Sequence, residues 1–227
     1  MPHRNDIDWA KFFNGENGVR RSLFNGRLTQ AQVDGCQRIA YWALDRFGFG
    51  FEETAYFMAT SYHETARRMK PVRETLARTD RGAAQALERA WRKGQLKWVR
   101  TPYWRADEDG RHWFGRGEVQ LTHKANYAGE LRQAVLEEFG EKYDILRNPG
   151  LLITCPDVST FVLIEGMTRS NTGVSDFTSY ALEDFINPDK CDFVGARRTV
   201  NPGDKPSYEK IAGEARAFLN AIRGAVR

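Results

Sequence analysis

Residues 29–68 have the sequence TQAQVDGCQRIAYWALDRFGFGFEETAYFMATSYHETARR, which predicts two successive helices. Thr29 is a suitable N-cap, and Gln32 follows three residues later, as in a capping box. Apolar residues then recur at three- and four-residue steps, which predicts an amphipathic helix over residues 29–48. A second helix is expected over residues 52–68, where one stripe is formed by Ala55, Met58, Ala59 and Tyr62. This stretch therefore favours a mainly α fold.

The rest of the chain fits the same fold class. Residues 112–122 contain two glycines and alternate poorly for a helix, so a short extended or hairpin element is expected there. Further helices are expected between Pro- and Gly-containing breaks, at residues 82–98, 123–140, 156–170, 178–186 and 205–223. The sequence thus predicts a mainly α, two-lobed domain with a small β-hairpin element.

Length and composition limit the class of protein. The chain has 227 residues and a net charge of +4, which fits one globular domain over residues 1–227. No apolar run approaches the ~20 residues that a membrane helix needs, and no secretory leader is expected. Three scattered cysteines argue against a zinc ribbon or a disulfide scaffold: Cys36, Cys155 and Cys191.

Charge is unevenly distributed along the chain. Residues 65–105 contain 12 Lys and Arg against three acidic residues, so this segment carries +9 and the remainder −5. Such a segment can bind an anionic polymer, namely nucleic acid, lipid headgroups or a cell-wall glycan with peptide carboxylates. A solvated face without a partner is the alternative. We expect residues 65–105 to form a basic helical lobe inserted into the domain.

Several common catalytic motifs are absent. His63-Glu64 lacks the second histidine of a zinc protease, and Gly115-Arg116-Gly117 is only half of a dinucleotide-binding loop. Only four histidines are present, so no metal site and no cofactor are expected. What remains is a carboxylate pair, Glu64 and Glu74. Glu64 follows an apolar helix face, which would raise its pKa, whereas cations flank Glu74 and would keep it ionised.

A second group of polar residues lies in residues 113–127. Gln120, Thr122, Asn126 and Tyr127 offer amides, a hydroxyl and a ring, which suit sugar hydroxyls and pyranose faces. A structural alternative is that Thr122 is the N-cap of the next helix. Trp113 can belong either to the core or to a sugar-binding surface.

Three patches together resemble the family 19 glycoside hydrolases, most closely the phage-type and bacterial members that degrade peptidoglycan. The patches occur in the expected order and are Ala59–Thr65 (ATSYHET), Phe114–Thr122 (FGRGEVQLT) with Asn126-Tyr127, and Arg197–Asp204 (RRTVNPGD). The chain departs from plant chitinases at Glu118, where they have proline, and at Ala66-Arg67, where the family has two glycines. These departures favour the phage-like branch over chitinases that act on crystalline chitin.

The resemblance implies roles for individual residues. Glu64 would be the general acid and Glu74 the general base, with Thr122 helping to hold the attacking water. The family inverts, so the two carboxyls should be ~6.5–9.5 Å apart. Positions implied or considered for the substrate are His63, for which packing is the alternative, Trp113, Gln120, Asn126, Tyr127, Arg198 and Asn201.

The sequence thus predicts a metal-free peptidoglycan glycosidase, of endolysin or muramidase type, that cleaves β-1,4 bonds between amino sugars. The alternatives are a chitinase and, from another class, a non-catalytic phage structural or wall-binding protein. The expected partner is peptidoglycan or a related amino-sugar polymer, with no nucleic acid, no stable membrane insertion and a monomeric chain. We expect synthesis in the cytoplasm and action on the cell wall after release by a holin, a phage particle or a secretion machine.

Overall fold

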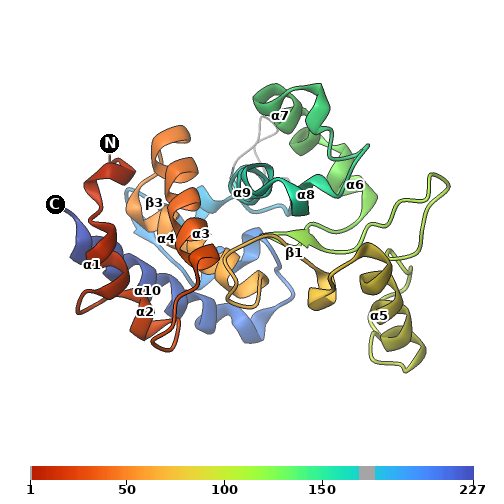
Figure 1. Cartoon of the computed structure of the whole chain (residues 1–227), viewed down its shortest axis with the longest axis horizontal. Helices are drawn as coiled ribbons and strands as arrows, with labels where there is room; N and C mark the ends of the chain where they lie inside the picture. The colour runs from red at the N-terminus through yellow and green to blue at the C-terminus, as the bar shows by residue number, and fades with distance from the viewer. Residues whose placement is uncertain (1, 169–176) are drawn as a thin grey trace. The chain divides into compact units, whose positions relative to one another are not determined.

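The computed structural model describes residues 2–168 and 177–227 (Figure 1). About 56% of the residues are helical and 5% lie in strands, which confirms the mainly α prediction. The chain forms two compact units. Unit 1 comprises residues 1–70 and 163–227, and unit 2 comprises residues 71–162. Most of the basic segment therefore lies in unit 2, while its proposed status as an inserted lobe of a single catalytic domain stays a prediction.

Unit 1 is built from both ends of the chain. Its elements are η1 (Arg4–Asp6), α1 (Trp9–Asn14), α2 (Val19–Ser22), α3 (Gln30–Ala40), the π-helix η2 (Tyr41–Arg46), α4 (Phe51–Glu64), η5 (Leu182–Asp184), β3 (Ile186–Asn187), β4 (Lys190–Cys191), η6 (Gly195–Thr199), η7 (Lys205–Ser207) and α10 (Tyr208–Ala225). The two chain ends pair through an isolated bridge between Ile7 and Val226, and the labelled ends lie near each other in Figure 1.

The core of unit 1 forms where α4 packs against α10. Every residue from Thr54 to Tyr62 is buried, so α4 is enclosed on all sides rather than along one stripe. The ring of Tyr62 meets that of Phe218 on α10 edge to face, with 5.9 Å between centroids. Burying large apolar side chains contributes roughly 1.5–3 kcal/mol each. The α4–α10 contact therefore holds in place the C-terminal end of α4, where Glu64 lies.

The predicted helix over residues 29–48 is confirmed in its start and continues as a π-helix. The Thr29 hydroxyl accepts from the Gln32 backbone N–H, and the Gln32 side chain accepts from the Thr29 N–H, which completes the capping box. Gly35 is buried within α3 because the chain after α4 passes close by: an added Cβ would lie 1.9 Å from the Met69 carbonyl oxygen. A side chain at this position would displace the turn that follows Glu64.

α4 begins near the predicted residue but ends at Glu64, four residues earlier than expected. Ala66, Arg67 and Met69 have positive φ angles of 49°, 68° and 52°, which turns the chain away from the helix axis. The Thr65 hydroxyl bridges this turn, since it donates to the Ser61 carbonyl at 2.6 Å and accepts from the Met69 N–H at 3.0 Å. Glu64 therefore stands at a helix end rather than within a helix.

Unit 2 contains short helices around a two-stranded antiparallel sheet. Its elements are β1 (Val72–Arg73), η3 (Glu74–Leu76), α5 (Asp80–Arg92), β2 (Arg116–Gly117), α6 (Lys124–Ala128), α7 (Glu130–Phe139), η4 (Glu141–Tyr143), α8 (Leu151–Thr154) and most of α9 (Pro156–Glu165). β1 pairs with β2 through Val72 with Gly117 and Arg73 with Arg116. Arg116 also bridges Leu121, so residues 116–121 form a tight loop; the sequence predicted a short extended or hairpin element over residues 112–122, and its strand, β2, pairs with the distant β1.

Other sequence predictions are corrected. The helix predicted over residues 123–140 is two helices, because Gly129 adopts an extended conformation between α6 and α7. The helix predicted over residues 82–98 is α5, which starts at Asp80 and ends at Arg92. The prediction for residues 178–186 is wrong: this region holds only η5 and leads into the β3–β4 hairpin. The last residues of the predicted helix 156–170 lie outside the described part of the chain.

The tryptophans of unit 2 mostly pack inside it. Trp104 is 1% exposed and packs with Ala83, Leu87 and Phe114 in one apolar cluster.

Over residues 2–168 and 177–227, no helix combines the length and apolar character needed to cross a membrane.

Candidate active site

Glu64 is held by a salt bridge from a distant part of unit 1. Its side chain is 15% exposed, and its Oε1 accepts from Arg197 Nη1 at 2.6 Å. Arg197 lies in η6 and is itself 4% exposed; its Nη2 donates to Asp204 Oδ2 at 2.8 Å. The Ser207 hydroxyl donates to the other oxygen of Asp204 at 2.9 Å. One buried guanidinium is thus shared between two carboxyls.

The protonation of Glu64 follows from burial more than from its partner. Burial raises its pKa, the charge and hydrogen bond of Arg197 lower it, and Asp204 raises it again, with a net upward direction. Burial lowers the pKa of Arg197, but Glu64 and Asp204 raise it more, so the guanidinium stays protonated. A carboxyl that retains its proton more readily than usual, at a helix end, has the property required of a general acid.

His63 precedes Glu64 and lines a small pocket in unit 1. The pocket has a volume of about 290 Å³, and its wall includes Ala66, Lys210 and Glu214. Burial lowers the pKa of His63 to about 4, and the charges of Arg197 and Lys210 act in the same direction, so its ring is neutral at pH 7. His63 Nδ1 lies 3.9 Å from Glu214 Oε2, and both atoms are buried without a hydrogen-bond partner among the described residues.

This His63–Glu214 contact is not a salt bridge. The imidazole is neutral, the 3.9 Å separation exceeds a hydrogen bond, and burial raises the pKa of Glu214. Two polar atoms that face each other across a pocket wall leave room for a bridging polar group. His63 therefore lines a polar pocket, while its predicted contact with substrate stays a prediction.

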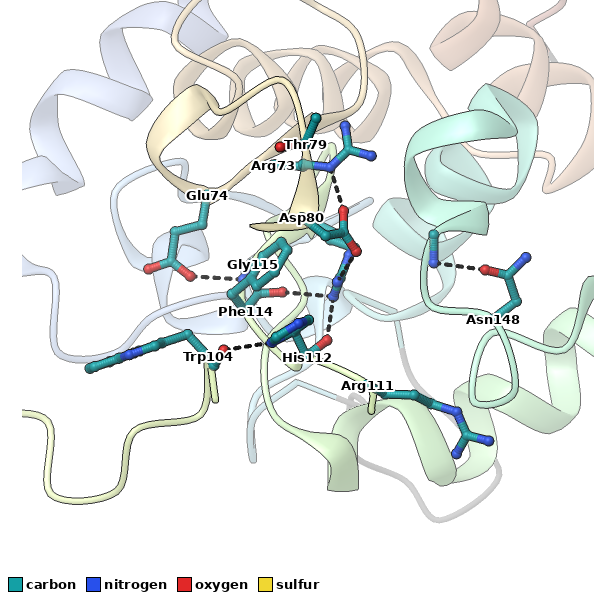
Figure 2. A network of polar contacts seen from close by, with 12 residues as sticks. Arg73, Glu74, Thr79, Asp80, Trp104, Arg111, His112, Phe114, Gly115 and Asn148 are labelled. Carbon is teal, nitrogen blue, oxygen red and sulfur yellow. Dashed lines mark hydrogen bonds and ion pairs between the residues drawn. The ribbon is translucent and has the colours of Figure 1, made fainter. Parts of the chain in front are cut away.

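Glu74 lies in unit 2 and is bound by neutral donors (Figure 2). Tyr103 donates its hydroxyl to Glu74 Oε1 at 2.9 Å, and the Gly115 N–H donates to Oε2 at 2.8 Å. The Glu74 N–H in turn donates to the Gly115 carbonyl at 2.7 Å. Each carboxylate oxygen keeps a further lone pair, so the group can still accept a proton from a water molecule.

Arg73, one of the cations expected beside Glu74, has other partners. Arg73 Nε donates to Asp80 Oδ1 at 2.5 Å, and Arg73 Nη1 to the Arg78 carbonyl at 3.1 Å. Glu74 is therefore positioned by Tyr103 and the backbone of Gly115, rather than by the basic residues next to it in the sequence.

Arg116 fixes the FGRG segment beneath Glu74. Its side chain is fully buried; Nη1 donates to the His112 carbonyl at 2.7 Å, and Nη2 forms a 2.7 Å ion pair with Asp80 (Figure 2). Its guanidinium also lies 3.8 Å from the centre of the Phe114 ring. Gly117, the next residue, has φ 88°, and a Cβ there would lie 2.9 Å from the Ser159 hydroxyl. These contacts show that folding alone accounts for Arg116 and Gly117 in the FGRG motif.

Most of the polar residues expected to bind sugar in residues 113–127 bond within unit 2. Gln120 donates to the Val72 carbonyl at 2.9 Å and the Gly117 carbonyl at 3.1 Å, and Asn126 donates to the Thr122 carbonyl at 2.8 Å. Tyr127 is fully buried and donates to the Leu121 carbonyl at 3.0 Å. Positive φ angles at Gly117 and Gln120 interrupt the extended conformation expected over residues 112–122.

Thr122 and Trp113 have different surroundings. Thr122 is half-buried but is not the N-cap of α6, because His123 occupies that position. The suggestion that Thr122 caps the helix is therefore wrong, and its water-holding role stays a prediction. Trp113 is 5% exposed; it donates to Asp107 Oδ2 at 3.0 Å and meets the Tyr127 ring edge to face. Trp113 is part of the core.

The two substrate residues predicted in the third patch lie on the surface of unit 1. Arg198 is exposed, with its guanidinium 5.3 Å from the centre of the Tyr180 ring. Asn201 is also exposed, and its side chain accepts from the Gly203 N–H at 3.1 Å in a turn. Both remain candidates for substrate contact.

Sequence reasoning missed the partners of the two carboxyls. Arg197 and Asp204 both belong to the quoted RRTVNPGD patch. The sequence prediction names Arg198 as a substrate residue and assigns no role to Asp204. Only a fold can show which of two adjacent arginines points inward. Tyr103 and Glu214 carry no motif signal.

Comparison with known proteins and the arrangement of possible metal ligands assign no further function to the chain. No protein-family model matches the chain, and no solved structure matches it significantly. Within the described residues, no three or more His, Cys, Asp or Glu side chains are grouped so that they could hold a metal ion. The two candidate carboxyls, Glu64 and Glu74, are each held by residues of their own unit.

Proposed function

We propose that the protein is a peptidoglycan-degrading glycoside hydrolase that cleaves β-1,4 bonds between amino sugars with inversion. The observation that carries the proposal is Glu64, whose carboxyl ends a buried helix and has a pKa raised by burial. Burial is the means by which glycosidases keep an acid protonated near neutral pH. The resemblance of the ATSYHET, FGRG and RRTVNPGD patches to lysozyme-like family 19 hydrolases supports the same role for Glu64.

In this proposal Glu64 protonates the leaving glycosidic oxygen, and Glu74 removes a proton from the attacking water. Arg197 favours the carboxylate that Glu64 becomes after it has donated its proton, because the guanidinium lies 2.6 Å away. Tyr103 and Gly115 hold the Glu74 carboxylate in one orientation. A single displacement of this kind uses two carboxyls and no covalent intermediate.

The proposal extends to the fold and the cellular role. We assign unit 1 and unit 2 to the two lobes of a lysozyme-like fold, with Glu64 on one and Glu74 on the other. The enzyme would act on the cell wall after release from the cytoplasm.

The test is hydrolysis of purified cell-wall sacculi by the parent and by Glu64→Gln. Glutamine keeps the shape and can still accept from Arg197, but it cannot donate the acid proton. We expect a loss of activity of about 10²–10⁴-fold, the usual contribution of general acid catalysis. Glu16→Gln, a change at an exposed carboxyl of unit 1, is the matched control and should leave activity unchanged.

Product analysis separates the alternatives. Reducing ends of the α anomer, seen by NMR early in the reaction, are expected for inversion at a β bond. New amines in place of reducing sugars would replace the proposal with an amidase. Faster cleavage of soluble chitin oligomers than of sacculi would favour a chitinase, and intact glycan strands with both parent and variant would refute a glycosidase.

A further inference from the structure

The largest pocket among those described lies within unit 2, and neither Tyr103 nor Gly115, the two residues that donate to Glu74, lines it. It has a volume of about 860 Å³ and is lined by one side of α5 and by residues between Trp104 and His112. Ligand pockets typically measure ~300–1,000 Å³, so it has room for more than one amino-acid residue. Neither Glu64 nor Glu74 lines this pocket, so the hydrolysis proposed for them leaves it without a role.

Three arginines and one glutamate supply most of the charge of its wall: Arg89, Arg92, Arg105 and Glu88. Arg92 Nε donates to Glu88 Oε1 at 2.9 Å, and Arg105 Nη2 donates to the same oxygen at 3.1 Å. The Trp104 indole N–H donates to Glu88 Oε2 at 3.0 Å. Hydrogen bonds from Arg105, Trp104 and Arg92 lower the pKa of Glu88 to about 2, so it is ionised.

Glu88 is therefore paired with Arg92 and Arg105 in the wall of the pocket. The three arginines of the wall outnumber this carboxylate, so the wall keeps a net positive charge. Arg89 lines the pocket and forms no ion pair within the described chain. The planar guanidinium fork matches a carboxylate through two parallel hydrogen bonds, which an ammonium group cannot reproduce. A second carboxylate, supplied by a ligand, would find Arg89 unoccupied.

The rest of the wall suits a peptide rather than a polyphosphate. Ala84 and Ala106 give the pocket an apolar portion next to the Trp104 ring. His112 Nδ1 lies 2.8 Å from the Trp104 carbonyl, and because a carbonyl only accepts, Nδ1 carries the proton (Figure 2). In the neutral ring, Nε2 is then an acceptor for an N–H group. The Glu88 carboxylate has no acceptor site left, because Arg105 Nε also donates to its Oε2 at 3.2 Å, but its negative charge still disfavours a run of phosphates.

We propose that this pocket is a subsite for the stem peptide of peptidoglycan, which carries free carboxylates, amide N–H groups and small aliphatic side chains. Arg89 would bind a peptide carboxylate, and His112 would accept from an N–H group, while Glu88 holds Arg92 and Arg105 in the wall. The inference rests on the proposed function, since the peptide belongs to the polymer that Glu64 would cleave. The basic segment, residues 65–105, would then bind a defined ligand, the stem peptide, instead of attracting anionic polymers in general.

The first experiment measures binding without turnover. A synthetic stem tetrapeptide (L-Ala, D-Glu, diaminopimelate, D-Ala) is titrated into the full-length Glu64→Gln variant at low ionic strength and followed by tryptophan fluorescence and calorimetry. We expect saturable binding, which weakens about tenfold when Arg89→Gln is added. Arg81→Gln removes the same charge from an exposed residue of α5 outside the pocket, and it should change the affinity by less than about twofold.

Chemical blocking of the peptide provides a second arm. Amidation of its carboxylates should weaken binding as much as Arg89→Gln does. Equal binding of free and amidated peptide, or equal effects of Arg89→Gln and Arg81→Gln, would overturn the inference. Tighter binding of a short DNA duplex, lost on the same Arg89 change, would overturn it in favour of a nucleic-acid site.

Hydrolysis separates this inference from the proposed function. The parent should cleave intact sacculi with a lower KM than glycan strands stripped of their peptides, and Arg89→Gln should lose that preference while it cleaves stripped strands like the parent. Cleavage of both substrates without peptide binding would overturn the subsite and keep the glycosidase. Peptide binding without cleavage of either substrate would refute the glycosidase and keep a peptide-binding pocket.

Discussion

Glu64 in unit 1 and Glu74 in unit 2 carry the same carboxyl group, yet their surroundings differ in kind. Glu64 is half-buried and lies against a buried arginine that comes from 133 residues later in the chain. Glu74 is half-buried and accepts from a tyrosine hydroxyl and a backbone N–H of its own unit. One carboxyl is matched by a buried charge, and the other by neutral donors.

The difference shows two ways in which a protein can hold a carboxyl group in place. At Glu64, burial and the charge of Arg197 oppose each other, and the carboxyl can change protonation state while it keeps the same partner. At Glu74, neutral donors fix direction without adding charge. We therefore expect substitutions around Glu64 to affect stability strongly and with pH dependence, and those around Glu74 to have small and local effects.

Replacing Arg197 tests the charged side of the comparison and should have the largest effect. Arg197→Gln leaves two carboxyls, those of Glu64 and Asp204, without their shared cation in a buried site. Removing one partner of a buried ion pair typically costs ~3–5 kcal/mol in the free energy of unfolding. Urea denaturation at pH 7 measures the loss, which should shrink at acid pH, where the carboxyls take up protons.

Arg198→Gln is the control for this substitution. Arg198 is the exposed neighbour, and its replacement should change the free energy of unfolding by less than about 0.5 kcal/mol. Similar losses for the two variants would show that the burial of Arg197 does not distinguish it from Arg198.

His63 tests whether burial dominates the region around Glu64, with an intermediate effect. Its pKa is about 4 in the folded protein, against an ordinary value of 6.5 in the unfolded chain, so the unfolded chain binds more protons between these values. The free energy of unfolding should therefore contain a contribution that is complete above pH 6.5 and is lost as pH falls toward 4. The contribution is about 3 kcal/mol, at 1.36 kcal/mol for each pH unit.

The measurement compares urea denaturation of the parent and of His63→Gln at about pH 7.5 and pH 4.5, on either side of most of this transition. The variant lacks the titrating ring, so the stability difference between the two proteins should change with pH in the stated direction. NMR titration of the parent gives an independent value, and a midpoint near 6.5 for His63 would contradict the prediction.

Tyr103 tests the neutral side of the comparison and should have the smallest effect. Tyr103→Phe removes the hydroxyl that donates to Glu74 Oε1 and should cost about 1 kcal/mol in the free energy of unfolding. If Glu74 is the base, kcat on sacculi should fall several-fold while KM stays the same, because the hydroxyl positions Glu74 and does not contact substrate.

Tyr143→Phe is the matched control in the same unit. No hydrogen bond is found for the Tyr143 hydroxyl in the described residues, and its removal should leave both stability and kcat unchanged. A larger loss for Tyr143→Phe than for Tyr103→Phe would contradict the role of the Tyr103 hydrogen bond.

Sequence patterns predicted the elements whose signals are local. The capping box at Thr29 and Gln32 marks the start of α3 because both partners lie within one turn. By contrast, the pattern over residues 178–186 contains apolar residues at helical spacing, but Leu182 and Ile186 belong to a 3₁₀ turn and a hairpin. Local periodicity does not reveal pairing with residues 190–191, and it does not reveal the positive φ angles that end α4.

Of the residues around the two candidate carboxyls, the sequence predicted the carboxyls themselves, Glu64 and Glu74, but not the side chains that hold them. Glu64 could be chosen because it follows an apolar helix face and because the ATSYHET patch that contains it resembles a family motif. Its partner could not be chosen, because the inward direction of Arg197 depends on how η6 packs in unit 1. Gln120 and Tyr127 have the chemistry of sugar-binding residues, but their polar atoms are used by nearby carbonyls.

The division of unit 1 between the two ends of the sequence also bears on the order of folding during synthesis. Unit 2 is continuous, so it is synthesised before residues 163–227 of unit 1, and domains generally fold as units in the order of synthesis. α4 must wait for α10, and Glu64 must wait for Arg197. The nascent chain therefore carries unit 2 together with an unpaired Glu64, and the Glu64–Arg197 pair and the α4–α10 contact form only after α10 has been translated.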